Sequence, residues 1–245
     1  MLVSIITVSF NSEKTIRKTI ESVLNQTYPK IEYLIIDGAS KDGTVEVARS
    51  YEDKVREKVY TYRIISEPDK GIYDAMNKGI RNATGELIGI INSDDWYEPN
   101  AVQTAAETCK ATGCDMFYAD INLIKDNGTI IVKRSKMNRL LSSRDWNHPT
   151  TFITKKCYDD VGVFRCEDIY DDFDLMMRIR RSGKKIVIRN EVLANFRTGG
   201  VSNQKSLKKC ISRCKTRYRC YRNNGYSRLY MIECIAMEFA KLILS

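Results

Sequence analysis

The chain carries Leu87-Ile88-Gly89-Ile90-Ile91-Asn92-Ser93-Asp94-Asp95, an apolar run that ends in two adjacent acids. The apolar part is short and rich in isoleucine, which indicates a buried strand. Two neighbouring carboxylates at the end of such a strand are unfavourable unless a positive charge meets them. A divalent cation carrying a phosphorylated ligand would supply it, because ligands of open α/β sheets bind beyond the strand C-termini. The alternative is a solvated loop in which Asp caps the next helix.

The residues before this stretch alternate between strand and helix patterns. β-Branched apolar runs predict strands, and apolar residues three or four apart predict helices. The expected order is a strand at 3–10, a helix that ends before Tyr28-Pro29, a strand at 31–36, a short helix at 44–51, a strand at 62–65, a helix at 72–82 and the strand at 87–91. Such alternation with short connections predicts an α/β fold with a doubly wound, mixed and mostly parallel sheet flanked by helices.

The second half continues with less regular patterns. We expect a helix at 101–111, a hairpin of strands 115–124 and 129–133 around Asn127-Gly128, a strand at 148–153, a helix at 172–181 and a strand at 185–196. The final residues predict a helix from about 206, an interruption at Asn223-Asn224-Gly225 and a second helix at 229–244. No internal repeat or low-complexity linker divides the chain, so we expect one domain with a C-terminal helical extension.

Composition restricts the class of protein. A chain of 245 residues with 43% hydrophobic content can bury a full core. It has no apolar run of about 18 residues and no signal-peptide pattern, so we expect it in the cytoplasm. The eight cysteines are scattered, with no Cys-x-x-Cys pair, and the single histidine, His148, has no cysteine near it. We therefore expect reduced cysteines and no zinc site.

The net charge of +9 is concentrated near the C-terminus. Nine cations and no acid stand in one segment: Lys205, Lys208, Lys209, Arg213, Lys215, Arg217, Arg219, Arg222 and Arg228. An apolar stripe runs through the same segment, so an amphipathic helix that binds an anionic inner leaflet is one interpretation. Nucleic-acid binding with tyrosine stacking is a second. A solvated charged face on a helix that packs on the core or forms a homodimer is the third.

Polar side chains follow the ends of the predicted strands and should meet at one edge of the sheet. Thr7, Ser9 and Asn11 mark the end of the first strand, and Asp37 follows the second. The segment 67–80 adds a polar loop and a helix start, in which Asp74 and Asn77 share one helix face. Neither a Gly-x-Gly-x-x-Gly nor a P-loop pattern occurs, which disfavours dinucleotide and P-loop sites.

Five motifs in order resemble glycosyltransferase family 2. They are Asp37-Gly38-Ala39-Ser40-Lys41-Asp42-Gly43-Thr44, Glu67-Pro68-Asp69-Lys70-Gly71-Ile72-Tyr73-Asp74-Ala75-Met76-Asn77-Lys78-Gly79, Asn92-Ser93-Asp94-Asp95, His148-Pro149-Thr150 and Asp171-Asp172-Phe173-Asp174-Leu175. The resemblance is strongest to bacterial enzymes of O-antigen, capsule and colanic-acid assembly and covers roughly residues 1–203. It implies a GT-A fold with a nucleotide-binding half at 1–98 and an acceptor half at 99–203, followed by the basic amphipathic tail at 204–245.

The resemblance also implies a nucleotide-sugar donor, with UDP favoured, and Mn²⁺ or Mg²⁺ as cofactor. It assigns the donor to Thr7, Ser9, Asn11, Asp37, Asp69, Lys70, Asp74, Asn77, Ser93 and Asp94. It places Asp95 and His148 at the metal and diphosphate. Asn92 stands where the family's Asp-x-Asp motif has its first acid, so the roles of Asp94 and Asp95 could be reversed.

An inverting transfer needs a carboxylate that takes the proton of the acceptor hydroxyl. Asp172 occupies the family position for this base, and Asp171 and Asp174 lie within one turn of it. A purely structural alternative is that the three acids only favour the positive helix N-terminus.

The predicted enzyme is an inverting, metal-dependent hexosyl- or N-acetylhexosaminyltransferase of surface polysaccharide biosynthesis, for example of lipopolysaccharide. Its acceptor would be a polyprenyl-diphosphate-linked saccharide, and it would sit on the inner face of the cell membrane without binding nucleic acid. The alternatives are a nucleotidyltransferase, which shares the sheet and the acidic ligands, and a basic adaptor that binds membrane or nucleic acid without catalysis.

Overall fold

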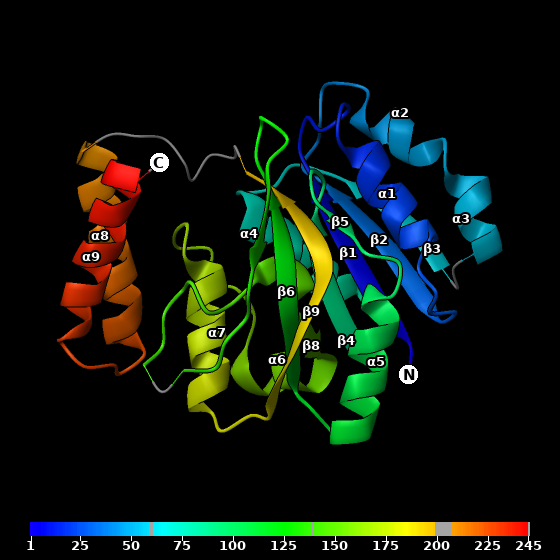
Figure 1. Cartoon of the computed structure of the whole chain (residues 1–245). Coiled ribbons are helices and arrows are strands. Elements are labelled where there is room, and N and C mark those ends of the chain that lie inside the picture. The colour runs from blue at the N-terminus through cyan, green and yellow to red at the C-terminus, as the bar shows by residue number, and fades with distance from the viewer. Residues whose placement is uncertain (59–60, 139, 199–206, 245) are drawn as a thin grey trace.

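The central strands are apolar on both faces, and this decides how the helices are placed. The computed structural model describes residues 1–58, 61–138, 140–198 and 207–244. Every residue of β1 (Val3–Ser9) and β2 (Ile31–Asp37) is buried, as are the first five of β4 (Leu87–Asn92). Because successive side chains of a strand point to opposite faces, both faces need a cover of helices. Figure 1 shows helices on both sides of one curled sheet.

The sheet has the order β3-β2-β1-β4-β8-β6-β9-β5, with β7 paired to β6. The first four strands are parallel, including β3 (Thr61–Ser66), and β9 (Ile186–Arg197) is parallel to β6 (Met116–Ile124). The antiparallel strands are β5 (Trp96–Tyr97), β7 (Ile130–Lys133) and β8 (Phe152–Thr154). The prediction of a mixed, mostly parallel α/β sheet with helices on both faces is confirmed.

Two apolar clusters lie on opposite faces of the sheet. The first face is covered by α1 (Ile16–Leu24), α2 (Thr44–Arg49), α3 (Glu52–Lys58) and α5 (Ala101–Thr112). The second face is covered by α4 (Ile72–Asn82), α6 (Lys155–Val161) and α7 (Asp171–Arg181). Gly79 lets α4 approach β1 closely, since a Cβ there would lie 2.5 Å from Cγ2 of Ile6.

The C-terminal residues form the predicted pair of helices, α8 (Leu207–Asn223) and α9 (Tyr230–Leu244). The pair lies beside α7 (Figure 1), where the rings of Tyr221 and Phe173 are 5.5 Å apart. Gly225, at a φ of 71°, makes the turn between the helices. The predicted boundary between 203 and 204 lies outside the described residues. Nowhere in the described chain is a helix both long and apolar enough to cross a membrane.

Three details differ from the sequence prediction. Helix α3 and strand β5 were not expected, and residues 148–150 form a 3₁₀ turn, η1 (His148–Thr150), in place of a strand. Pro149 has no N–H for a strand ladder, which favours the turn. The amide of Asn147 and the hydroxyl of Thr150 both donate to the carbonyl oxygen of Ala119, which ties this turn to β6.

The prediction that all cysteines are reduced is wrong for one pair. Cys109 and Cys114 form a disulfide, with their Cα atoms 4.8 Å apart. Cys109 lies in the last turn of α5, and Gly113 caps that helix in the left-handed conformation at a φ of 67°. This cap folds the chain back and brings Cys114 beside the helix. The other six cysteines are free.

Candidate functional site

The polar strand ends lie level at one edge of the sheet. Ser9 of β1 is paired in register with Asp37 of β2, and Asp37 with Ser66 of β3. Val8 is paired with Asn92 of β4, so the acidic pair follows at the same edge. The register therefore brings together residues as far apart in the sequence as Val8 and Asn92, as the sequence predicted.

Asp37 is the hub of this edge. Its buried carboxylate accepts hydrogen bonds from the hydroxyls of Ser9, Ser40 and Ser66 and from the backbone N–H of Ser40. Four donors from three segments leave little room for a further partner. A bond from Asp37 to a donor molecule would have to replace one of these.

The loop after β1 is fixed to the loop after β2. Asn11 has a positive φ of 49°, donates its N–H to the hydroxyl of Ser40 at 2.8 Å and accepts from the N–H of Lys41 at 2.9 Å. Below it, the Thr7 hydroxyl lies 3.0 Å from the hydroxyl of Tyr33. Thr7 thus lies inside the core, whereas Asn11 holds the rim of the edge.

The segment before α4 is ordered by its own side chains. Asp69 accepts from the N–H of Gly71 at 2.8 Å, and Asp74 accepts from the N–H of Lys70 at 3.1 Å. Asp69 also lies against Gly38, where any Cβ would meet its Oδ2. Lys70 itself is exposed. Asp69 therefore lies next to the end of β2, and the donor-binding role of Asp69 and Lys70 stays a prediction.

The side chain of Asn77, three residues after Asp74 on α4, forms its hydrogen bonds inside the protein. Its buried amide donates to the carbonyl oxygen of Phe164 at 2.8 Å and accepts from the N–H of Phe164 at 3.0 Å. It thereby joins α4 to the loop that leads to α7. This use of the amide is internal to the fold.

The two acids after β4, Asp94 and Asp95, differ in burial and in hydrogen bonding. Asp94 is partly buried, whereas Asp95 is only 1% exposed. Oδ1 of Asp95 accepts the N–H of Arg197 at 3.0 Å, while its buried Oδ2 has no hydrogen-bond partner. The Ser93 hydroxyl donates to that of Ser12 at 2.7 Å. Asp95 is therefore the member of the pair with an unsatisfied oxygen inside the protein.

The electrostatics of the pair fit a cation. Burial and the charge of Asp94 raise the pKa of Asp95 well above its usual value, although the N–H and guanidinium of Arg197 oppose this rise. Burial also raises the pKa of Asp94. A nearby positive charge would lower both.

The residues at this edge can supply oxygen ligands to Mg²⁺ or Mn²⁺. Oδ1 of Asn92 is buried and unpartnered, like Oδ2 of Asp95. No group of three or more His, Cys, Asp or Glu side chains within the described residues is arranged to hold a metal. One or two protein oxygens are nevertheless enough where phosphates complete the coordination, as Mg²⁺ sites with nucleotides do. The site thus fits a cation that arrives with a diphosphate.

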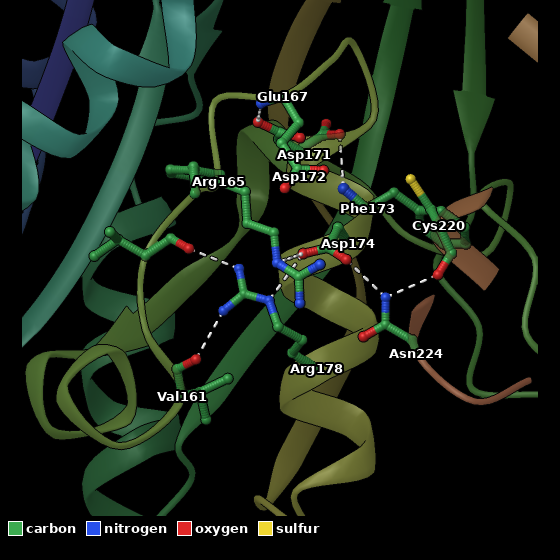
Figure 2. Close-up of polar contacts among 12 residues, drawn as sticks. Val161, Arg165, Glu167, Asp171, Asp172, Phe173, Asp174, Arg178, Cys220 and Asn224 are labelled. Atoms are coloured by element: carbon green, nitrogen blue, oxygen red, sulfur yellow. Dashed lines mark hydrogen bonds and ion pairs between the residues drawn. The ribbon is translucent and has the colours of Figure 1, made fainter. Parts of the chain in front are cut away.

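A second acidic group stands at the start of α7, and its members have different surroundings. Asp171 accepts the N–H groups of Glu167 and Asp168, at 2.7 and 3.2 Å. Figure 2 shows the guanidinium groups of Arg178 and Arg165 on one side of Asp174, where they lie 2.8 and 3.4 Å from Oδ2. Both of these acids serve the local fold.

Asp172, unlike Asp174, has no ion pair among the described residues, and unlike Asp171 it does not bind the loop before the helix. The N–H of Phe173 donates to its Oδ1 at 2.7 Å (Figure 2), and the Tyr73 hydroxyl also hydrogen-bonds to it. Its carboxylate lines a small pocket together with His148, Trp146 and Phe164. Of the three rival acids, Asp172 is the one with oxygen atoms still available.

The charges around Asp172 set its pKa. Burial raises the pKa, and the His148 imidazole, the N–H of Phe173 and hydrogen bonding by the Tyr73 hydroxyl lower it. Burial lowers the pKa of His148, against the charge of Asp172. Nε2 of His148 is buried and unpartnered. The structure thus places His148 beside the predicted base, and its joint role with Asp95 at a metal remains a prediction.

Sequence reasoning missed two residues of the site. Tyr73 was quoted only as part of a motif, yet its hydroxyl lies at Asp172 and donates to the carbonyl oxygen of Ile169 at 3.1 Å. Its position four residues before Asn77 on one helix face was a usable signal. Arg197 donates to Asp95 across 102 positions, and no local pattern announces that contact.

Comparisons with known proteins give the chain a family. The model of glycosyl transferase family 2 matches residues 4–169. TuaG of Bacillus subtilis, whose own assignment to teichuronic acid biosynthesis is provisional, is 31% identical over 132 residues, which cover 54% of this chain and 51% of TuaG. The PGL/p-HBAD biosynthesis glycosyltransferase Rv2957 of Mycobacterium tuberculosis is 27% identical over 206 residues, 82% of this chain and 78% of that protein. The chain spans about half the length of TuaG.

Solved structures share the fold at low identity. The S. aureus TarS 1–349 complex with UDP-GlcNAc has a TM-score of 0.72 at 17% identity, over 98% of this chain and 72% of TarS. The mannosyltransferase PcManGT of Pyrobaculum calidifontis, in complex with GDP-Man and Mn²⁺, has a TM-score of 0.69 at 17% identity, over 99% of this chain and 70% of that one. The predicted GT-A fold is confirmed. With the family model matching more than half of its residues, the chain belongs to glycosyl transferase family 2.

Proposed function

We propose that this chain is an inverting, metal-dependent glycosyltransferase. It would move a hexosyl or N-acetylhexosaminyl group from a nucleotide sugar to a hydroxyl of a lipid-linked saccharide in surface polysaccharide biosynthesis. The observation that carries the proposal is the contrast at the start of α7. Asp171 and Asp174 are engaged with the chain's own donors, whereas Asp172 keeps an available carboxylate in a pocket next to His148.

Asp172 would act as the general base. It would accept the proton of the acceptor hydroxyl while that oxygen forms a bond to the anomeric carbon. The bond from this carbon to the phosphate oxygen would break on the opposite face, and the nucleoside diphosphate would leave with the electron pair. Its raised pKa helps, because a base is most effective when its pKa lies near the working pH.

The strand edge would hold the donor. All ten predicted residues remain our donor-binding residues there. Asn11, Asp69, Lys70, Asp74 and Asp94 would contact the donor from the accessible rim, and the buried Thr7, Ser9, Asp37, Asn77 and Ser93 would support them through their bonds to the chain. UDP is the favoured nucleotide. The UDP-GlcNAc in the TarS complex supports a nucleotide-sugar donor, and the GDP-Man of PcManGT makes guanosine the main competitor.

Asp95 would hold Mn²⁺ or Mg²⁺, with His148 as the second predicted ligand. When bound, the cation would neutralise the charge that develops on the departing diphosphate. The unpartnered Oδ2 of Asp95 and the Mn²⁺ in the PcManGT complex support this part of the proposal.

The test is a turnover assay with a panel of UDP- and GDP-sugars in Mn²⁺, which measures release of the nucleoside diphosphate. We expect Asp172→Asn to lower kcat by about 10²–10⁴-fold, the usual contribution of a general base. The change leaves size and hydrogen-bonding shape almost intact. Donor binding, followed by thermal shift, should persist. Full turnover by Asp172→Asn would overturn the assignment of the base.

The tail would keep the enzyme at the inner face of the cell membrane, near its polyprenyl-diphosphate-linked acceptor. Leu229, Ile232 and Ile235 are 73, 67 and 43% exposed and follow one another at three-residue spacing. Exposed Arg222 and Arg228 lie nearby in sequence. Apolar residues beside cations favour an anionic lipid surface. The tail has fewer available cations than its composition indicates, because Arg213, Arg217 and Arg219 pair with Glu238 and Asp168.

Sedimentation with vesicles tests this part. The full chain should pellet with vesicles of phosphatidylcholine and phosphatidylglycerol, and Ile232→Ser with Ile235→Ser should release it. The matched control is Ile130→Ser with Ile131→Ser, two exposed apolar residues of β7. Unchanged pelleting of the tail variant would contradict membrane binding. A dimer that the tail variant converts to monomer would instead assign this face to a second copy.

A further inference from the structure

The α8–α9 pair contains a buried ion pair that the proposed function does not use. Arg217 and Glu238 are each 1% exposed, and Nη2 of Arg217 lies 2.9 Å from Oε1 of Glu238. Arg213 donates to the other oxygen, Oε2, at 2.8 Å. Nε and Nη1 of Arg217 are buried without partners. Burying charges with unsatisfied N–H groups costs stability, and apolar residues of similar size are often as good or better.

The ion pair ends on Tyr170, the residue directly before α7. The Tyr170 hydroxyl accepts from Nη2 of Arg217 at 3.0 Å and donates to Oε1 of Glu238 at 3.3 Å. The guanidinium carbon of Arg217 lies 5.0 Å from the centre of the Tyr170 ring. Burial raises the pKa of Tyr170 to about 12, so its hydroxyl keeps the proton that it donates. Both the position and the direction of this hydroxyl are therefore fixed by the tail.

Two further contacts join the tail to the residues around Tyr170. Arg219 pairs with Oδ2 of Asp168 at 2.8 Å, and Oδ1 of Asp168 accepts the N–H of Tyr170 at 2.8 Å. On the other side, the amide of Asn224 donates to Oδ1 of Asp174 at 2.7 Å (Figure 2). The segment 168–174 is thus held by the tail before and after Asp172.

We propose that the α8–α9 pair positions the catalytic carboxylate, with Arg217 and Glu238 holding Tyr170 and thereby fixing the first turn of α7 that carries Asp172. The proposal rests on Asp172 being the base. The carbonyl oxygen of Tyr170 accepts the N–H of Asp174 at 2.8 Å, so a shift of Tyr170 moves the backbone on which Asp172 stands. The family model ends at residue 169, so both the base and its support lie beyond the matched segment.

The decisive variant replaces the ion pair and the second cation on Glu238 by apolar residues, Arg217→Met and Glu238→Met with Arg213→Met, because Arg213, 11% exposed, also pairs with Glu238. A purely structural role predicts that kcat follows stability, and this exchange should leave the Tm unchanged or raise it. A positioning role predicts that kcat falls about 10- to 100-fold at unchanged Tm, because a displacement of about 1 Å at a reacting group costs that much. The donor KM should stay within about twofold, since the donor edge lies on other elements.

The matched control removes an exposed ion pair, Lys156→Met with Asp160→Met, whose atoms are 2.7 Å apart on α6. It should leave kcat and KM at parental values. If the triple variant does not fold, Tyr170→Phe removes only the hydroxyl, and we expect a fall in kcat of about 3- to 10-fold. Glu238→Gln, which can still accept from Tyr170, should retain more activity than Glu238→Met.

Parental kcat in a folded protein with Arg213→Met, Arg217→Met and Glu238→Met, or in Tyr170→Phe, would overturn the positioning role. Asp172→Asn, measured in the same assay, separates this failure from failure of the proposed function. Parental turnover by Asp172→Asn would show that Asp172 is not the base, and the proposed function would then fail at this point. An inactive Asp172→Asn beside a fully active ion-pair variant would leave the base in place and reject only its support.

Discussion

The acidic pair after β4 and the acidic group at the start of α7 have similar sequences and opposite environments. At β4, Asp95 keeps a buried Oδ2 without a partner, and the neighbouring charge of Asp94 raises its pKa. At α7, Asp174 pairs with two guanidinium groups, and Asp171 accepts two N–H groups of the preceding loop. A cluster of acids in the sequence therefore does not by itself indicate a functional site, because the fold neutralises some of the acids and leaves others available.

The difference separates two kinds of carboxylate. A carboxylate that is fully paired inside the protein stabilises the fold, and its loss leaves buried cations behind. A carboxylate that the fold leaves unsatisfied lowers stability and can serve a ligand or a proton. Asp174 belongs to the first kind, and Asp95 and Asp172 to the second. Removing each kind should therefore change stability in opposite directions.

The largest expected effect is that of Asp95→Asn. We expect turnover in Mn²⁺ to fall about a thousandfold, because a cation at a departing diphosphate contributes several kcal/mol. Without metal, the same change should raise the Tm by about 2–4 °C, the shift that corresponds to about 1 kcal/mol in a chain of this size.

The gain in Tm should depend on pH with a definite sign. The pKa of Asp95 is higher in the folded protein than its usual 3.8, so the parent loses stability as the pH rises through the folded-state pKa. The advantage of Asp95→Asn should be present at neutral pH and absent near pH 4. Thermal unfolding at both pH values, with Asp94→Asn for comparison, measures it. A lower Tm of Asp95→Asn with normal turnover would mean that Asp95 stabilises the fold, as Asp174 does.

Asp174→Asn should have the next largest effect, with the opposite sign for stability. Loss of its charge leaves Arg178, whose side chain is only 14% exposed, without its anion. We expect the free energy of unfolding to fall by about 3 kcal/mol, as for other broken buried pairs. Urea denaturation gives the value. The control is Asp160→Asn, whose pairs with Lys156 and Lys184 are exposed to solvent, so its loss should lower the free energy of unfolding much less.

The sequence predicts this contrast only in part. Strands, helices and the shared edge follow from local periodicity and from the rule for parallel sheets, and from β1 to β4 they are correct except that α3 was not predicted. The pairing of each acid depends on partners far along the chain. Asn224 lies 50 positions from Asp174, and Glu238 lies 21 from Arg217. A count of acids or cations cannot find such partners, which is why the tail seemed more basic at its surface than it is.

Local backbone geometry explains the remaining differences. The disulfide depends on the left-handed conformation of Gly113, which brings Cys114 back to α5. The turn at His148 depends on Pro149 and on side-chain bonds to β6. Asn77 was grouped with Asp74 by helix spacing, yet it faces Phe164 on another segment. Spacing gives the face of a helix, whereas the neighbour of that face is decided by packing.

The smallest expected effect tests the environment of Asp172 itself. Hydrogen bonding by the Tyr73 hydroxyl lowers the pKa of Asp172, so Tyr73→Phe should raise that pKa. A base must be deprotonated, and the acidic limb of kcat/KM against pH should therefore move to higher pH, by about one unit or less. At a pH well above the limb, kcat/KM should return close to the parental value. The Tyr73 hydroxyl has a single proton, and it also donates to the carbonyl oxygen of Ile169. An unmoved limb with parental kcat/KM would mean that this proton stays on Ile169, and Asp172 would then depend on His148 and on the N–H of Phe173 alone.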